Sequence, residues 1–299
     1  MTLRQLATFL ELSRSGSVKV AAERLFVSQP AVSAVIASLQ RELGVALVTR
    51  AGRGLRLTPS GTVLAGYARR IQGVLDEAAV AAVGAGARMR VRLGAVTTAG
   101  EFILPAAIAG FRALRPDAEV SLEVTNRAQV WERLEAHEVD LVVAGRPPEA
   151  RGLRIRGLRP NELVIVAAPE MLRRPRPLAA CTWLLREPGS GTRSAVEHYL
   201  ATQGIAPSTL TLGSNGAVRE AAAVGLGVTL MSRDAVASEL SSGRLVVLEA
   251  AGVPLQREWH IVTRDEPELP GAATLFLDHL MTHSGFARTD DWPSRLGPA

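Results

Sequence analysis

The chain has 299 residues, of which 47% are hydrophobic and 21% charged, so it can bury the cores of two or three compact units. Its one cysteine, Cys181, excludes an internal disulfide and a cysteine-rich metal site, and is expected to be a small buried apolar side chain. The net charge of +5 divides into +6 for residues 1–88 and −1 for the remainder, which predicts a nucleic-acid surface on the first part and a different task for the rest.

The N-terminal segment does not read as a signal peptide, because Arg4, Gln5 and Glu11 interrupt its apolar run. No later segment approaches the length of a membrane-spanning helix. We therefore expect a cytoplasmic protein that does not contact a membrane.

Residues 18–44, VKVAAERLFVSQPAVSAVIASLQRELG, predict two helices joined by a tight turn. Ser28 is expected to cap the second helix, with Pro30 in its first turn, where a missing N–H costs nothing. Apolar residues at helical spacing predict its buried stripe: Val32, Ile36, Leu39 and Leu43. Other faces carry Gln29, Ser33, Ala37 and Gln40, a small polar surface that suits a DNA major groove. Spacing alone fits any packed helix pair equally well.

The next segment, LVTRAGRGLRL at 47–57, predicts a hairpin, or wing, that carries Arg50, Arg53 and Arg56. Exposed arginines beside a turn are usually only solvated. Next to a recognition helix, however, they would reach the phosphates that flank the groove.

A long helix is expected from Thr58 and Pro59, the cap and first residue, to the glycines Gly84 and Gly86. One side of it is apolar: Val63, Leu64, Tyr67, Ile71, Val74, Leu75 and Ala78. Because this stripe has little of its own domain to bury against, we expect it to pair with the same helix of a second subunit. A plain spacer is the alternative.

From Arg90 onward strands alternate with helices, which predicts α/β units built on a parallel, doubly wound sheet. The first unit has strands RVRLGAVT, EVSLEVT and DLVVAG, with helices over 102–114 and 129–137. The second has strands ELVIVAAP, TWLLRE, TLTLGS, GVTLMS and RLVVLEA, with helices over 192–203, 217–224 and 233–240. A strand at 257–264 and a helix at 272–283 close the chain. We expect two lobes joined by crossovers near 159–162 and 256–262, with a ligand in the cleft between them.

Ligands of open parallel sheets bind beyond the carboxyl ends of the strands, where helices begin. The residues expected there are Thr97, Thr98, Asn126, Arg146, Gly191, Thr192, Arg193, Ser214 and Asn215. Their hydroxyl, amide and guanidinium groups suit a small anion, although such residues are also ordinary helix caps. The Gly-Ser-Gly-Thr stretch lacks the lysine of a Walker loop, so no nucleotide cofactor is expected.

The stretch AAERLFVSQPAVSAVIASLQRELGV, followed by TRAGRGLRLTPSG, resembles the N-terminal domain of the LysR-type transcriptional regulators, continuously from about Leu3 to Gly61. The resemblance implies binding to double-stranded promoter DNA, a dimer formed through the linker helix, and tetramers built from dimers. The expected DNA-binding residues are Ser28, Gln29, Pro30, Ser33, Ala34, Arg50, Arg53 and Arg56. This chain has Ala34 and Ala37 where the family often carries a basic residue, so that face offers few contacts to bases or phosphates.

Three further stretches, VTNRAQVWERL, DLVVAGRPP and SNGAVREAAAVGLGVTLMS, resemble the family branch that regulates Calvin-cycle carbon-fixation operons. Regulators of that branch respond to phosphorylated or acidic metabolites. This implies a small anionic effector, which fits Arg146 and Arg193 facing the cleft.

The overall prediction is an α+β multidomain regulator: a winged helix-turn-helix at 1–58, a linker helix at 59–88, effector lobe I at 89–161 and 263–285, lobe II at 162–262, and a flexible tail at 286–299. The two lobes are of periplasmic-binding-protein type. The alternative is a cytosolic small-molecule-binding protein of that fold without regulation. An enzyme is not expected, because no catalytic triad is legible and His279 and His283 lack the carboxylate of a zinc HExxH motif.

Overall fold

The structure is a computed structural model that describes residues 1–51, 54–83, 89–149, 152–266, 269 and 271–289. The chain divides into two compact units, Met1–Ala87 with Glu135–Glu138, and Arg88–Leu134 with Val139–Ala299.

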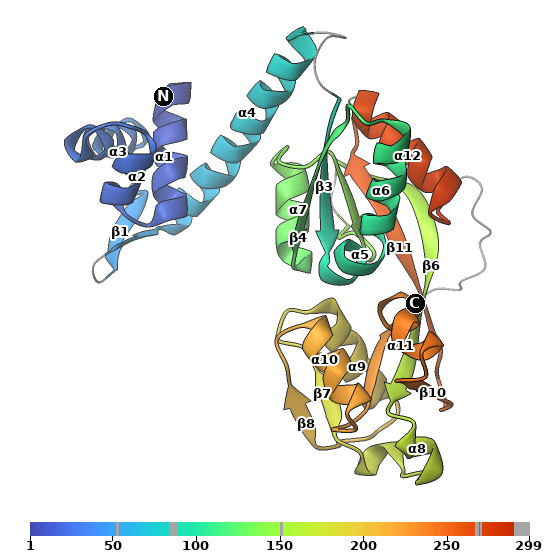
Figure 1. Cartoon of the computed structure of the whole chain (residues 1–299). Helices are drawn as coiled ribbons and strands as arrows, with labels where there is room; N and C mark the ends of the chain where they lie inside the picture. The colour runs from blue at the N-terminus through green and yellow to red at the C-terminus, as the bar shows by residue number, and fades with distance from the viewer. Residues whose placement is uncertain (52–53, 84–88, 150–151, 267–268, 270, 290–299) are drawn as a thin grey trace. The chain divides into compact units, whose positions relative to one another are not determined.

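The first unit has three helices, a hairpin and a long helix (Figure 1): α1 (Leu3–Ser15), α2 (Val18–Arg24), α3 (Gln29–Leu43), β1 (Val48–Ala51), β2 (Gly54–Leu57) and α4 (Pro59–Val83). The Ser28 hydroxyl caps α3 by accepting a hydrogen bond from the Ala31 N–H at 3.3 Å, with Pro30 in the first turn. Val32, Ile36 and Leu39 are buried in a core shared with α1 and α2. The predicted helix-turn-helix and its cap are therefore confirmed.

Two residues of α3 differ from their expected roles. Leu43 is exposed, because the helix ends at the left-handed Gly44 and no neighbour covers its last turn. Gln40 is structural, since its side-chain oxygen accepts hydrogen bonds from the N–H groups of Leu47 and Val48 at 2.8 and 3.3 Å. Gln40 thereby ties the end of the helix to the start of the hairpin.

Helix α4 begins as predicted, with the Thr58 hydroxyl accepting from the Gly61 N–H at 3.0 Å. A Cβ on Gly61 would lie only 2.0 Å from the Leu47 carbonyl oxygen, so this close approach needs a glycine. The expected apolar stripe divides between two directions. Leu64 and Ile71 pack against the core of the first unit, whereas Val63, Tyr67 and Val74 remain exposed. The expectation that the whole stripe lacks a partner in its own domain is therefore wrong for Leu64 and Ile71.

The second unit is built on an eight-stranded sheet. The strands whose hydrogen bonds order it are β10-β6-β11-β5-β3-β4, with β9 and β12 also paired to β6. Their bounds are β3 (Arg90–Val96), β4 (Glu119–Thr125), β5 (Leu141–Ala144), β6 (Leu153–Ala167), β9 (Thr229–Ser232), β10 (Val246–Leu248), β11 (Leu255–Arg264) and β12 (Ala287–Arg288). The long strands β6 and β11 pair with each other and extend from one half of this unit into the other (Figure 1).

We call the part that contains β3–β5 lobe I. Its helices are α5 (Thr97–Phe102), α6 (Leu104–Leu114), α7 (Arg127–Glu135) and α12 (Gly271–His283). Helices α6 and α12 pack on one face of the sheet and α7 on the other. The core lies between them and is formed by apolar residues of β3, β5 and β11.

We call the other part lobe II. A second, two-stranded parallel sheet joins β7 (Trp183–Leu185) to β8 (Thr209–Thr211). The helices are α8 (Glu170–Arg173), α9 (Gly191–Thr202), α10 (Asn215–Ala223) and α11 (Ala237–Ser241), with short 3-10 turns η2 (Leu178–Ala180) and η3 (Arg233–Val236). Cys181 is buried in this core as expected, and burial raises the pKa of its thiol.

Several expectations need correction. Among the described strands of the eight-stranded sheet, only β3, β4 and β5 pair in parallel; β11 is antiparallel to both β5 and β6, because it returns from lobe II in the opposite direction. The expected helix 102–114 begins later, at Leu104, and Phe102 instead ends the short helix α5, which was not predicted. The flexible tail is wrong for its first residues: Phe286 is buried and Ala287–Arg288 pair with Leu158 and Gly157. Residues 290–299 lie outside the described residues.

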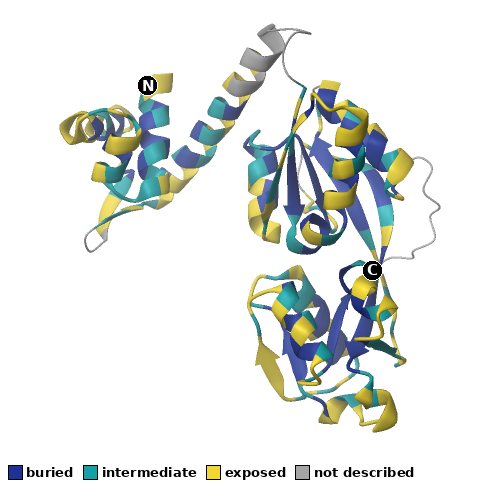
Figure 2. Ribbon diagram, viewed as in Figure 1, coloured by how far each residue is buried: buried dark blue, intermediate teal, exposed yellow. Residues whose placement is uncertain are grey.

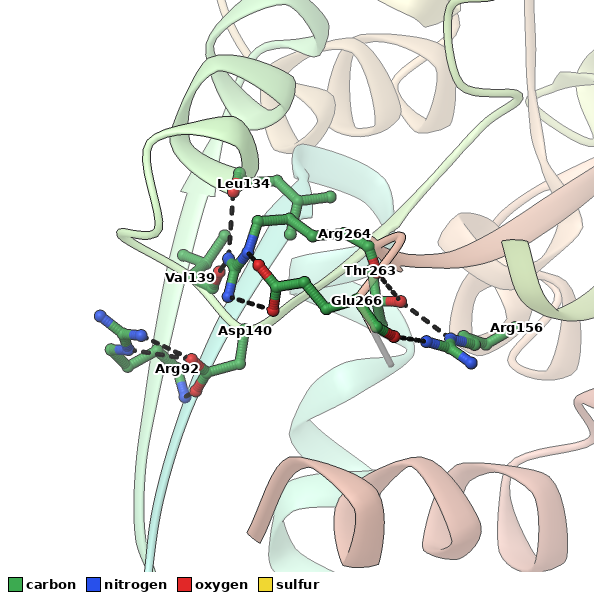
Figure 3. Close-up of polar contacts among 8 residues, drawn as sticks. All are labelled: Arg92, Leu134, Val139, Asp140, Arg156, Thr263, Arg264 and Glu266. Carbon is green, nitrogen blue, oxygen red and sulfur yellow. Dashed lines mark hydrogen bonds and ion pairs between the residues drawn. The ribbon is translucent and has the colours of Figure 1, made fainter. Parts of the chain in front are cut away.

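A buried ion pair fixes the strands of lobe I (Figure 3). The Asp140 carboxylate accepts hydrogen bonds from the backbone N–H of Arg92 at 2.7 Å and from its Nε and Nη2 at 3.1 and 2.6 Å. Nearby, the Arg264 guanidinium donates to the carbonyls of Leu134 and Val139 at 3.1 and 3.0 Å. Both networks join segments that are far apart in the sequence.

Candidate nucleic-acid interface and interlobe site

The outer face of α3 presents small side chains. Gln29, Pro30, Ser33 and Ala34, all expected DNA-binding residues, are exposed on this helix, as is Ala37. Figure 2 colours each part of the chain by its burial. The Ser28 hydroxyl accepts the capping hydrogen bond, so its own proton stays available to a phosphate oxygen. Since Ser33, Ala34 and Ala37 are small, the middle of this helix can approach a groove closely.

The hairpin β1–β2 carries Arg50 and Arg56, both exposed. Arg50 is paired with Leu55 and Arg56 with Thr49, so the two arginines lie on opposite faces of the ribbon. Neither makes an ion pair with another described residue. Both charges are available to phosphates, but to different ones. Arg53 lies outside the described residues.

Two of the expected effector residues meet directly between the lobes. Asn215, the first residue of α10 in lobe II, is fully buried, and its Nδ2 donates to the Thr98 hydroxyl of lobe I at 3.2 Å. The same Nδ2 lies 3.4 Å from a carboxylate oxygen of Glu101. A strand-end threonine and a helix-start asparagine thus form a polar link across the cleft.

Arg186 is a third member of this site, and the sequence analysis missed it. It directly follows β7, its side chain is 6% exposed, and its Nη1 donates to Oδ1 of Asn215. Its Nε and Nη2 each donate to an oxygen of Glu187 at 2.7 Å. The hydrogen bond from Arg186 holds the pKa of the Glu187 carboxyl below its usual range. Its position at the carboxyl end of a buried strand was the signal that could have identified it.

The remaining expected residues are not gathered at this link. Asn126 and Ser214 cap α7 and α10, by accepting from the N–H groups of Gln129 and Ala217 at 3.0 and 3.1 Å. The Arg193 guanidinium donates to Glu197 at 2.7 Å and to the Arg186 carbonyl at 2.9 Å. It thereby stabilises the loop between Arg186 and the start of α9. Thr97 begins α5, Gly191 and Thr192 begin α9, and Arg146 is exposed beyond β5.

A positive field surrounds the end of β5. Burial lowers the pKa of His260, and the nearby Arg146 lowers it further, against the opposite effect of Glu258. Burial also lowers the pKa of Arg257, with a contribution from Arg127.

Two hollows stand out in the described structure, and the expected effector residues line neither. One, of about 610 Å³, lies between α6 and α12. The other, of about 500 Å³, lies beside α8 and is lined in part by Arg173, Arg174 and Arg176. The contact between Thr98 and Asn215 itself fills the space between the lobes at that point.

Among the described residues, no three His, Cys, Asp or Glu side chains are grouped so as to hold a metal ion. In the same part of the chain no single helix is long and apolar enough to cross a membrane, and α2 and α3 reach that length and composition only as a pair bent by 109°.

Two protein families match this chain in succession. Residues 3–62 match the family described as "Bacterial regulatory helix-turn-helix protein, lysR family", and residues 84–285 match the one described as "LysR substrate binding domain". The HTH-type transcriptional regulator CbbR of Rhodospirillum rubrum is 36% identical over 278 residues, covering 91% of this chain and 93% of that protein. The RuBisCO operon transcriptional regulator of Allochromatium vinosum is 32% identical over 296 residues, covering 95% and 97%.

Solved structures are similar as well. The regulatory domain of CcmR from Synechocystis PCC6803 in complex with 2-PG is 32% identical, with a TM-score of 0.58, and covers 65% of this chain and 97% of that one. A full-length OxyR variant from Pseudomonas aeruginosa is 23% identical, with a TM-score of 0.70, and covers 98% and 99%. The second likeness concerns the fold alone.

Proposed function

Because this chain belongs to the LysR family of transcriptional regulators, as its sequence predicted, we propose that a small anionic metabolite bound between its lobes changes how it regulates its target promoters. The observation that carries this proposal is the link from Thr98 through Asn215 to the buried guanidinium of Arg186. An anion attracted to Arg186 would act on the polar contacts that Asn215 makes with Thr98 and Glu101 of lobe I. Binding energy that differs between two arrangements of the lobes is what shifts their equilibrium.

We propose promoters of carbon-fixation operons as the targets. The supporting relatives are the one named CbbR and the one named a RuBisCO operon regulator, which match this chain over more than nine-tenths of its length. The CcmR domain described with 2-PG supports an effector that carries an acidic group. Nothing in these names points to a reaction, and we assign no enzymatic activity.

We assign promoter DNA binding to residues 1–58, dimerisation to 59–88, and effector binding to lobe I (89–161 and 263–285) and lobe II (162–262). Because these relatives are bacterial DNA-binding regulators, we propose that the protein works in the cytoplasm. We further propose a tetramer of two dimers, each dimer held by the exposed face of α4. The alternative, a small-molecule-binding protein without regulation, predicts no specific binding to the chain's own promoter region in an electrophoretic shift assay.

The DNA-binding assignment predicts two kinds of variant. Arg50→Ala and Arg56→Ala should weaken binding to all DNA sequences, and each should reduce the slope of log affinity against log salt by about 0.9, because each removes one phosphate contact. Gln29→Ala and Ser33→Ala should instead cost about 1–3 kcal/mol, mainly at preferred sites. Fluorescence anisotropy over a salt series, with operator and random duplexes, measures both effects.

Arg24→Ala is the control for the wing variants. It removes the same charge from the same unit, but the Arg24 guanidinium is already paired with Glu11 at 2.9 Å. Its salt slope should match that of the wild type. If all four interface variants kept wild-type affinity, the assignment of this surface would be wrong.

The effector assignment predicts that Thr98→Val binds its metabolite about tenfold more weakly, because the Asn215 amide loses a buried acceptor. Arg193→Ala should weaken binding less, since its guanidinium serves its own loop. Calorimetry with sugar phosphates, carboxylates and nucleotides identifies the ligand. Thr202→Val is the control, because that hydroxyl bonds only to its own helix, at the His198 carbonyl. Equal affinity in the wild type and both site variants would place the site elsewhere, and binding without any change in operator affinity would contradict the coupling.

A further inference from the structure

Arg186 carries a buried positive charge that needs partners. Its side chain is 6% exposed, and removing the partner of a buried charge leaves it uncompensated at a high cost. Asn215 supplies a neutral oxygen to Nη1, whereas Nε and Nη2 of this guanidinium are bound by an anion. That anion is the carboxylate of Glu187.

The Glu187 carboxylate binds Arg186 as a free anion would. Its two oxygens accept from Nε and Nη2, both at 2.7 Å, in the parallel two-bond arrangement by which guanidinium recognises carboxylates and phosphates. The Glu187 side chain is nevertheless 41% exposed. The outer edge of Arg186, which carries Nε and Nη2, is therefore covered by a carboxylate that water can hydrate.

The two partners differ in how easily they can leave. Glu187 can turn into water and recover its hydration, since its side chain is already partly exposed and Pro188 and Gly189 beyond it are exposed. Arg186 cannot follow, because its Nη1 is bound to the fully buried Asn215. The guanidinium is thus fixed and its counter-ion is exchangeable.

We propose that Glu187 is an internal stand-in for the effector: its carboxylate covers the outer edge of Arg186 until a carboxylate or phosphate group of the effector replaces it. This inference rests on the proposed function and adds a built-in competitor to the same site. The exchange is selective, because a replacing group must offer two oxygens to Nε and Nη2 together. Competition also weakens the apparent affinity for the effector. The smaller the fraction of time for which Glu187 leaves the edge uncovered, the weaker this affinity is.

The exchange has a route to lobe I. Arg186 holds Oδ1 of Asn215, and Nδ2 of the same amide reaches Thr98 and Glu101. An incoming dianion brings more negative charge than Glu187 did, and it would bind the guanidinium that holds the same Asn215 amide. The contact between the lobes therefore senses which anion occupies Arg186.

The test is a titration of full-length wild type and Glu187→Gln with inorganic phosphate and with 2-PG, followed by calorimetry. Glutamine keeps the shape but removes the competing charge, so Glu187→Gln should bind both probes about tenfold more tightly. Glu197→Gln is the matched control: it removes the same charge nearby, from the exposed partner of Arg193. Its affinities should stay within about twofold of the wild type.

A second measurement uses the wild type alone, so it does not depend on how a variant folds. Carbon-13 NMR of the Glu187 carboxyl should show a pKa below the usual range without added anion, and a pKa that rises toward the ordinary value at saturating phosphate. A pKa that stays low on saturation would overturn the proposal.

Unchanged or weaker binding by Glu187→Gln would overturn it too, as would the failure of both proteins to bind either probe. The proposed function fails separately. If a metabolite binds wild type and Glu187→Gln equally and still shifts operator binding, the proposed sensor function stands and the role of Glu187 is wrong. If a metabolite binds Glu187→Gln more tightly but never affects operator binding, the role of Glu187 stands and the proposed sensor function is wrong.

Discussion

Replacing Val74 with glutamate should convert a dimer into monomers and lower affinity for a two-half-site operator by about a thousandfold. Val63, Tyr67 and Val74 are exposed apolar side chains that recur at intervals of four and seven residues on α4, which is the spacing of a helix-pairing seam. A carboxylate in the middle of this face would be buried without a partner in the dimer. Sedimentation velocity and a gel shift report the two effects.

The control is Thr62→Glu, which adds the same charge to an exposed position on another side of α4. It should sediment as a dimer and bind the operator normally. Ile71→Glu would not serve, because Ile71 packs against the core of its own unit and its loss would disturb the fold as well. A dimeric Val74→Glu would show that the exposed face of α4 is not the seam.

Replacing Asp140 with alanine should lower the free energy of unfolding of the second unit by about 3–5 kcal/mol. The carboxylate is buried and accepts hydrogen bonds from both the backbone N–H and the guanidinium of Arg92 (Figure 3). Its removal therefore leaves a partly buried cation and a backbone donor without this acceptor. Urea unfolding followed by tryptophan fluorescence measures the loss.

Asp278→Ala provides the comparison. The Asp278 carboxylate is paired with Arg288 at 2.8 Å, close to the 2.6 Å between Asp140 and Arg92. Both side chains of the Asp278 pair are, however, more than half exposed. Solvent screening limits such a pair to about 0–1 kcal/mol. If the two alanine variants lost equal stability, burial would not be what makes the Asp140 pair important.

Features set by a few neighbouring residues were predictable from the sequence. Ser28 with Pro30, and Thr58 with Pro59, begin helices through hydrogen bonds that span only three residues. Leu43 shows the limit of periodicity: it continues the apolar stripe of α3, but burial also needs a neighbour, and the chain turns away at Gly44. Periodicity identifies the side chains that could be buried, whereas tertiary contacts decide which of them are.

Strand β6 was only half predicted for the same reason. Its second half, ELVIVA, has strong strand propensity, whereas its first half, LRIRGLRP, contains glycine, proline and three arginines. Pairing with β11 holds that first half extended. Helix α5 was missed because Val96, its cap, makes no side-chain capping hydrogen bond.

The candidate site followed the same division. The sequence placed Thr98 and Asn215 at strand-to-helix turns in different lobes, both facing the cleft, and they lie in hydrogen-bond contact. Arg186 was missed because its burial depends on Asn215, which is distant in sequence. Arg146 and Arg193 were expected to face the cleft, but the guanidinium of Arg193 is held by Glu197 and a loop carbonyl instead.

Strands β6 and β11 form the mechanical connection between the lobes. Their register runs without a gap in β11 from Leu255 opposite Leu163 to Arg264 opposite Leu153, with one irregularity beside Ile261. Sliding by one residue would turn the buried Trp259 and Ile261 to the opposite face, so translation along the strands is blocked. Between residues 159–162 and 256–259 the two strands pair only with each other among the described strands, and a two-stranded ribbon tolerates more twist than a wide sheet. Rotation of the lobes about this short segment is therefore the relative movement that the sheet opposes least.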